Sequence, residues 1–337
     1  MTRTRTLLAL SGLTTLVALF AVGTADAVST ERFVLDDADA LAAGELIRTT
    51  VHSDGRVTLG VELRRLPMPD DVPLIYATAT APDGTVFLGT GNDGKIYRLR
   101  GESIEEHAET GQLLVSSLAV GDGGVLYAGT VPEGRIYRVA SDGAVTEIAR
   151  PDGVEHVWDL AWDSRRNTLF AATGPDGKVF AIDAQGNASL YWDSPASHVM
   201  SLALDTDGTL YAGTSDDAIV VRLTGPGRAE VVHDFPGNEV TALDVRDGVL
   251  AVGANEFPDP PNVTRAHSKQ RSATGGRAPR PRAGKGRLFR VGADGRTERL
   301  WAQDSGHVTS VQVMDDGTLY GGLGAKGRIV RVNPDRS

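Results

Sequence analysis

The sequence predicts an all-β protein, a β-propeller of four-stranded antiparallel blades, with six blades preferred over seven. A turn followed by a short apolar strand recurs six times; four of the five intervals are 40 to 43 residues, and the last, of 69, contains an insertion. Each interval has room for four short strands, and no stretch keeps the helical periodicity of 3.6 residues. Four strands per repeat favour a propeller over a β-sandwich or a solenoid, because blades that pack in a closed ring cover one another's faces.

The first 27 residues predict a secretory signal peptide. Arg3 and Arg5 precede an apolar run from Leu7 to Val22, and Ala25-Asp26-Ala27 gives a small-x-small cleavage pattern. An uncleaved anchor is the alternative, although the apolar run is short for a membrane span. We therefore expect a secreted or periplasmic protein with no transmembrane helix in the mature chain. The chain contains no cysteine, so neither disulfides nor a lipidated cysteine contribute.

Residues 28–71 predict a separate N-terminal segment with two strands. These strands are Glu45 to Val51 and Arg56 to Leu63, joined by the turn Ser53-Asp54-Gly55. The last repeat stops after its third strand, at Val332, so its blade lacks an outer strand. We expect one N-terminal strand to pair with that blade and close the ring. In the alternative of seven blades, both strands form part of an incomplete seventh blade.

Residues 72–337 carry the repeats. The repeated strand and the turn before it begin at positions 84, 124, 167, 208, 248 and 317. Val115 to Val120 is typical of the first strand of a repeat, Gly124 to Gly129 of the second, Arg135 to Val139 of the third and Ala144 to Ala149 of the fourth. The third strands alternate basic and apolar residues, as expected when one face is buried. Asp-Gly turns between strands supply the backbone angles of tight hairpins.

An insertion at residues 255–286 separates the second and third strands of the fifth repeat. It contains five prolines, and its seven basic residues against two acidic ones give it a formal charge of about +5. The basic residues are Arg265, Lys269, Arg271, Arg277, Arg280, Arg282 and Lys285. This composition predicts a disordered surface loop. It is either a tolerated insertion or an arm that binds an acidic partner, an anionic polymer or membrane headgroups.

Equivalent positions of successive blades converge on the axis of a propeller, so a ligand site is sought there. Four repeats place a polar residue before the first-strand valine, where the first two repeats have Leu74 and Leu114. These candidate ligand-binding residues are His156, His198, Glu239 and His307. Imidazole and carboxylate groups suit zinc or iron, so the same residues are candidate metal ligands. Histidines that only hydrogen-bond within their blades explain the pattern without any ligand.

The sequence resembles exported bacterial propellers of the WD-repeat, NHL-repeat and quinoprotein-like superfamily. The resemblance rests on Ser305 to Val311 followed by Asp316-Gly317, and on residues 89–98. The third strands lack the Trp-Asp ending of WD repeats, since they end Arg98-Leu99 and Arg138-Val139. The superfamily includes scaffolds, sensors and some enzymes, so the resemblance implies a fold and no activity. Propellers of the virginiamycin B lyase or gluconolactonase type would hold a metal in the axial cavity, and only the four polar residues match such a site.

The sequence thus favours an exported scaffold that binds a protein, small-molecule or carbohydrate ligand, with no catalytic residues assigned and no cofactor required. A metal-dependent lyase or hydrolase at the channel mouth is the alternative. No Gly-x-Ser-x-Gly, phosphate loop or His-Glu-x-x-His motif occurs. The net charge of -10 disfavours nucleic-acid binding. A closed ring leaves no terminal blade exposed, so we expect a monomer.

Overall fold

The computed structural model describes residues 40–41, 44, 46–60, 64–70, 72, 74–91, 93–258, 284–324 and 327–335. The predicted signal peptide lies outside these residues. The chain divides into two compact units, residues 1–63 and residues 64–337, and each is described by itself. No helix in the described part of the chain is long and apolar enough to cross a membrane.

The first unit contains a hairpin of two short strands. They are β1 (Thr49–Val51) and β2 (Val57–Leu59), which pair antiparallel with Thr50 opposite Thr58. The turn between them includes Asp54, whose side chain accepts a hydrogen bond from the Arg56 backbone at 3.0 Å. The strands form where the sequence predicts them, but both are shorter than expected.

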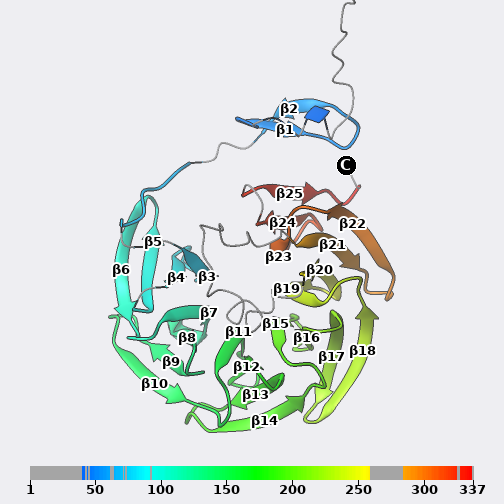
Figure 1. Ribbon diagram of the computed structural model, residues 1–337. Coiled ribbons are helices and arrows are strands. Elements are labelled where there is room, and N and C mark those ends of the chain that lie inside the picture. Colours follow the sequence, from blue (N-terminus) through cyan, green and yellow to red (C-terminus); the bar gives the residue numbers. More distant parts are fainter. Residues whose placement is uncertain are drawn as a thin grey trace, which may run out of the picture. The chain divides into compact units, whose positions relative to one another are not determined.

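The second unit contains six antiparallel sheets, which Figure 1 shows around a common centre with the first strand of each sheet innermost. Blade 1 consists of β3 (Ile75–Thr80), β4 (Val86–Thr90), β5 (Lys95–Arg100) and β6 (Ser103–Glu109). Blade 2 consists of β7 (Leu114–Val120), β8 (Leu126–Val131), β9 (Ile136–Val139) and β10 (Val145–Ala149), with a 3-10 turn, η1 (Asp122–Gly124), after its first strand. Blade 3 consists of β11 (His156–Asp163), β12 (Thr168–Gly174), β13 (Lys178–Ile182) and β14 (Ala188–Asp193).

The remaining blades follow the same order. Blade 4 consists of β15 (Val199–Leu204), β16 (Leu210–Thr214), β17 (Ile219–Gly225) and β18 (Arg228–Asp234). Blade 5 consists of β19 (Glu239–Arg246), β20 (Val249–Glu256), β21 (Lys285–Val291) and β22 (Thr297–Gln303). Blade 6 has three strands, β23 (Val308–Val313), β24 (Leu319–Leu323) and β25 (Ile329–Val332). The prediction of six blades is therefore confirmed, with five blades of four strands and a sixth of three.

Adjacent blades pack closely because the second strand of a blade has a small residue opposite the first strand of the next. An ideal Cβ on Gly213 would lie 2.6 Å from Cγ1 of Val240, and one on Gly253 would lie 2.7 Å from Cγ1 of Val308. A larger residue at either glycine would push the blades apart. The glycines of the repeated motif thus set the spacing between blades as well as forming turns.

Blade 1 lacks this packing on the side that faces away from blade 2. Ile75 pairs with Thr90 in the same register in which Val115 pairs with Thr130 in blade 2. Ile75 is 45% exposed. The valines at this position in the other five blades, each 0% exposed, are Val115, Val157, Val199, Val240 and Val308. Each of the first five blades thus buries the equivalent valine of the next blade. Among the described residues, the sixth blade does not bury Ile75 of blade 1 in this way.

The predicted pairing of an N-terminal strand with the last blade is not present among the described strands. β1 and β2 pair with each other in a sheet of their own, and the sheet of β25 has three strands. Sequence patterns identified the strands, but they do not encode which exposed edge a short strand selects.

Candidate binding site at the channel mouth

The four predicted site residues lie at the same end of the inner strands. His156 and Glu239 begin β11 and β19, while His198 and His307 come one residue before β15 and β23. Each inner strand begins beside the end of the second strand of its own blade, as in the pairing of His156 with Gly174 and of Glu239 with Asn255. We call this end of the propeller the mouth. The loops from second to third strands and from fourth to first strands meet here.

Two of the predicted histidines lie together around Trp158, and we call His156, Trp158 and His198 the mouth cluster. The ring of His156 stacks on Trp158, with centroids 4.9 Å apart and planes 12° apart. The ring of His198 meets Trp158 edge-on at 5.6 Å and lies 5.9 Å from the ring of His156. All three side chains are half-buried. Blades 3 and 4 therefore share a partly exposed aromatic surface.

A hydrogen bond across the blade junction determines the protonation of His198. Trp158 Nε1 donates to His198 Nδ1 at 3.0 Å. An indole N–H can only donate, so His198 Nδ1 must accept and the ring proton sits on Nε2. Burial and the neighbouring charge of His156 both lower the pKa of His198, which favours this neutral form. His156 Nδ1 is buried and has no hydrogen-bond partner.

Gly174 makes the space for this pair. It ends β12, and an ideal Cβ there would overlap His198 Nδ1 and lie 2.9 Å from Trp158 Nε1. Any other residue at this position would displace one of the two rings. The contact between blades 3 and 4 therefore requires glycine at position 174.

Two carboxylates continue the mouth into blade 5. Ser215 Oγ accepts a hydrogen bond from the His198 backbone at 3.0 Å, and Ser215 also forms a β-bridge with Glu239. Next to Ser215, the carboxylate of Asp216 accepts the Ser197 backbone N–H at 2.7 Å. That bond lowers the pKa of Asp216, whereas burial and the charge of Asp216 raise the pKa of Glu239. Within the described residues, neither carboxylate forms an ion pair.

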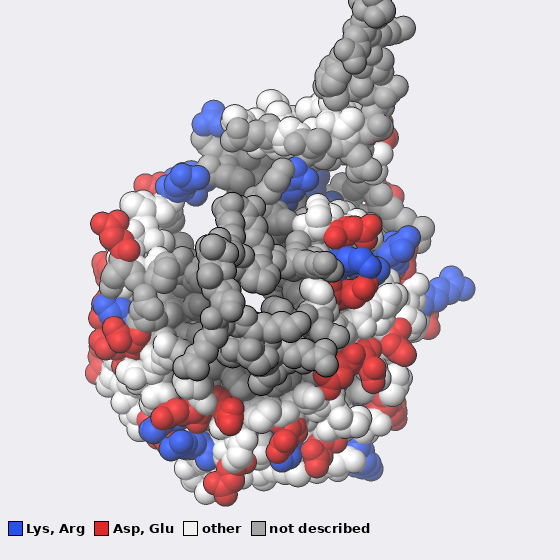
Figure 2. Space-filling model, viewed as in Figure 1, with Lys and Arg blue, Asp and Glu red and all other residues white. Residues whose placement is uncertain are grey.

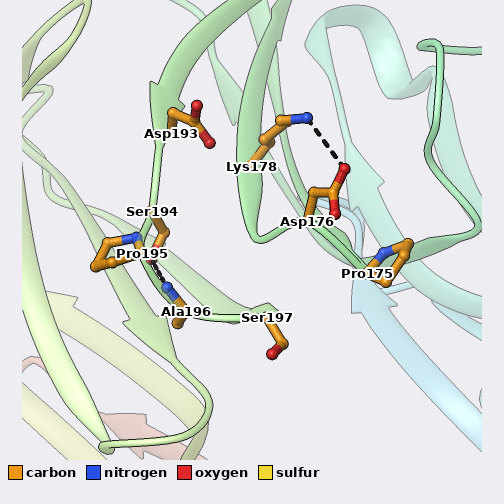
Figure 3. Close-up of a pocket in the computed structure, with 8 residues that line it drawn as sticks. All are labelled: Pro175, Asp176, Lys178, Asp193, Ser194, Pro195, Ala196 and Ser197. Carbon is orange, nitrogen blue, oxygen red and sulfur yellow. Dashed lines mark hydrogen bonds and ion pairs between the residues drawn. The ribbon is translucent and has the colours of Figure 1, made fainter.

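An open hollow of about 430 Å³ adjoins the mouth on blades 3 and 4. Figure 3 shows its lining residues on the β12–β13 and β14–β15 loops and the adjoining strand ends. Lys178 is the one basic lining residue, and it forms an ion pair with Asp176 at 3.4 Å. Asp193, in register with Lys178, is the second acidic residue there. The backbone of Ser197 connects the hollow to Asp216, so the two features form one continuous surface.

His307 stands apart from the mouth cluster. Its ring contacts Phe257 at 5.4 Å, and Gly324 leaves room for it. No three His, Asp or Glu side chains in the described part of the chain lie close enough together to hold a metal ion. Because Trp158 occupies His198 Nδ1 and His307 packs on Phe257, the four predicted residues do not form a converging set of metal ligands in this arrangement.

The basic residues of the insertion lie outside the described residues, except Lys285. Lys285 begins β21, and its Nζ forms an ion pair with Glu256 at 3.0 Å. The insertion is shorter than the predicted 255–286, because Asn255 and Glu256 belong to β20 and Lys285 and Gly286 to β21. Glu256 pairs with Lys285, so the hairpin of β20 and β21 continues into the proline-rich, basic stretch that the composition assigned to the insertion.

Sequence patterns carry little sign of the positions that Trp158, Gly174 and Asp216 take at the mouth. Trp158 lies two residues after His156 and so on the same side of a strand, which is the one pattern that could have linked them. Asp216 lies in a Ser-Asp-Asp turn that looks like many hairpin turns. The need for glycine at position 174 follows only from the approach of His198, which belongs to the next blade, and no sequence pattern predicts that contact.

Comparison with known proteins places the fold in a family. The family model described as outer membrane protein assembly factor BamB matches residues 75–336, which is most of the chain. A search of curated proteins gave no match.

Several solved structures share the fold at low sequence identity. A catalytically inactive virginiamycin B lyase from Staphylococcus aureus, solved with quinupristin, is 12% identical with a TM-score of 0.58, covering 80% of this chain and 87% of that one. A streptogramin B lyase is 17% identical with a TM-score of 0.52, covering 79% and 94%. A chain of a nidogen/laminin complex is 15% identical with a TM-score of 0.53, covering 74% and 89%. Such identities establish a common fold and leave the chemistry of this chain to its own residues.

Proposed function

Because this chain belongs to the family of outer membrane protein assembly factor BamB, we propose that it is a binding propeller that acts outside the cytoplasm and contacts a partner protein through its mouth. The proposed location is periplasmic or secreted, and it is supported by the signal-peptide pattern of residues 1–27. The expected state is a monomeric scaffold that needs no cofactor.

The continuous surface from the hollow to the mouth cluster carries the proposal. It combines a half-buried indole, two imidazoles and carboxylates on the strand ends and loops of three successive blades. Aromatic groups with a polar atom are frequent anchors of protein interfaces, because they bury apolar area and still form a hydrogen bond. Rigid strands position these groups, as suits a preformed binding site.

Site-specific photo-crosslinking in cells tests the proposal. We expect benzoylphenylalanine in place of exposed Pro195, in the hollow, to give discrete covalent adducts with a partner. Benzoylphenylalanine in place of exposed Ser141 is the control, because the turn between β9 and β10 lies at the opposite end of the blade. Equal adducts from both positions, or none from Pro195, would count against a binding site at the mouth.

A metal-dependent lyase or hydrolase is the second function that the sequence suggested. It would require the rings of His156 and His198 to leave Trp158 and converge with Glu239 and His307. Elemental analysis of the purified mature protein tests it, with a His156→Ala/His307→Ala double variant as the control. Stoichiometric zinc, iron or manganese in the wild type, with less in the variant, would favour the metal-dependent enzyme over the scaffold. Absence of metal from both samples would favour the scaffold.

A further inference from the structure

The chemistry of the mouth identifies the kind of partner that it fits. Two carboxylates from adjacent blades, Asp216 and Glu239, lie near the mouth cluster. Asp216 accepts the Ser197 backbone N–H, and the backbone of Glu239 forms a β-bridge with Ser215. The charge of Asp216 raises the pKa of Glu239. No Lys or Arg among the described residues forms an ion pair with either carboxylate, whereas Asp176 pairs with Lys178.

The hollow adds to the same charge. Its lining contains Asp176 and Asp193 against the single base Lys178. Figure 2 shows groups of acidic side chains on the described surface of this view, with basic side chains between them. A chain laid from the hollow to the axis would therefore pass a surface with an excess of carboxylates.

The mouth cluster adjoins these carboxylates, because the His198 backbone donates to Ser215, the residue before Asp216. A neutral His198 with its proton on Nε2 brings no positive charge to the surface that would repel a cation. The half-exposed indole of Trp158 offers apolar area for the alkyl part of a long basic side chain, and an indole is the ring that binds cations best.

We propose that the mouth binds an extended basic peptide segment of a partner protein, with an ammonium or guanidinium group between Asp216 and Glu239 and its alkyl stem against Trp158. This inference rests on the proposed function and names the chemistry of the partner. The hollow takes the next part of the peptide, where Asp193 and Asp176 face a second basic residue.

Calorimetric titration of the mature protein tests this proposal. The probe is the peptide acetyl-Gly-Lys-Gly-Lys-Gly-Lys-Gly-amide, and peptides with Gln or Glu in place of each Lys are the controls. We expect the Lys peptide to bind, with an affinity that falls as salt is added, and the other two peptides to show no binding.

Two charge-matched double variants locate the binding. Asp216→Asn/Glu239→Gln keeps the shape of both side chains and the acceptor for Ser197, and we expect at least a tenfold loss of affinity. Asp122→Asn/Asp142→Asn removes the same charge from exposed turns at the opposite end, and we expect a change of less than twofold. Unchanged unfolding midpoints show that both variants are folded.

Three outcomes would overturn the inference. They are equal affinity in both double variants, equal binding of the Lys and Gln peptides, and no binding of the Lys peptide. If the Lys peptide fails while Pro195 still gives a partner adduct in cells, the mouth binds a partner of other chemistry and the proposed function stands. If both fail, the proposed function fails as well.

Discussion

The single polar atom of the Trp158 side chain, Nε1, forms a hydrogen bond that links two blades. The indole N–H donates to His198 Nδ1 across the junction of blades 3 and 4. The bond satisfies a donor that would be costly to bury alone, and it orients an imidazole at the channel mouth. The proposed binding surface and the junction of blades 3 and 4 thus share the same side chains, and predictions about single residues follow from their contacts.

Gly174→Ala should disturb the mouth and lower stability. The new methyl group would overlap His198 Nδ1, so one of the two rings must move. We expect a loss of about 1–3 kcal/mol in the free energy of unfolding, the usual cost of overpacking. Denaturant unfolding measures it. Gly321→Ala is the control, since its Cβ would approach only the Leu288 side chain, at 3.3 Å, and a similar loss in both variants would refute the steric argument.

Asp159 should make the protein less stable as the pH rises from about 4 to about 6. Burial raises its pKa to about 6 from an ordinary value of 3.8, although the Leu202 and Leu160 backbone N–H groups oppose the shift. The folded protein therefore binds this proton more tightly than the unfolded chain does. The cost of ionising Asp159 is absent below about pH 4 and complete above about pH 6, at most about 3 kcal/mol.

The variant Asp159→Asn isolates this effect. It cannot ionise, so the difference between wild type and variant in the free energy of unfolding should change between pH 4.5 and pH 7, in favour of the variant at pH 7. Burial lowers the pKa values of His107 and His198 and gives a trend of opposite sign, which the difference cancels. A difference that does not vary with pH would show that Asp159 keeps an ordinary pKa.

Blades are joined by polar contacts as well as by the glycine–valine packing. Asp244 accepts the Val313 backbone N–H of blade 6 at 2.7 Å, and Ser201 donates to the Val240 carbonyl of blade 5 at 2.9 Å. These bonds connect inner strands to inner strands. Blades 4, 5 and 6 are therefore joined by hydrogen bonds as well as by burial.

Asn255→Ala should cost more than an ordinary polar truncation. Asn255 is fully buried at the end of β20, accepts the Val308 N–H at 2.8 Å and donates to the Val308 carbonyl at 2.9 Å. Alanine would leave both backbone groups of Val308 without this partner. We expect a loss of about 2–4 kcal/mol in the free energy of unfolding. Thermal or denaturant unfolding measures it, and exposed Asn187→Ala should cost less than about 1 kcal/mol; equal losses would contradict the bridging role.

The elements of the fold were largely predictable, and the contacts between them were not. Apolar alternation and Asp-Gly turns place β7, β9 and β10 within one residue of their predicted bounds and β8 within two, because they reflect burial inside one blade. The pairing of Trp158 with His198 depends on a register shift in β11, where Val157 pairs with Thr173 and Asp159 with Ala172. Such a bulge re-aims side chains without a signal in the composition. The histidines were found, but their partners required the structure.

At the scale of the whole molecule, the side of blade 1 that faces away from blade 2 is unlike the other junctions. Ile75 is 45% exposed, and Tyr76 beside it is 48% exposed. In blade 6, the nearest atoms to an ideal Cβ on Gly322 belong to Ser310 and Thr309 of the same blade, whereas Gly253 faces the next blade. The sequence predicted closure by an N-terminal strand, and the described strands do not show that pairing.

A matched pair of substitutions tests closure in the full mature chain. If Ile75 is as exposed in solution as it is here, Ile75→Asp should cost less than about 1 kcal/mol. Val115→Asp at the equivalent position of blade 2 should cost more than about 4 kcal/mol, because it buries a charge. Denaturant unfolding of both variants gives the comparison. Equal costs would show that another part of the chain or a second copy covers Ile75.

The most direct test of the account is the set of indole N–H resonances of the mature protein in a titration with the lysine peptide. The four tryptophans give four signals, and the one missing from Trp158→Phe belongs to Trp158. The account predicts that this signal lies downfield because of its bond to His198, and that the peptide moves it while the signals of Trp162, Trp192 and Trp301 stay in place. A Trp158 signal that does not move, or peptide-dependent shifts at the other tryptophans alone, would contradict a binding site at the mouth.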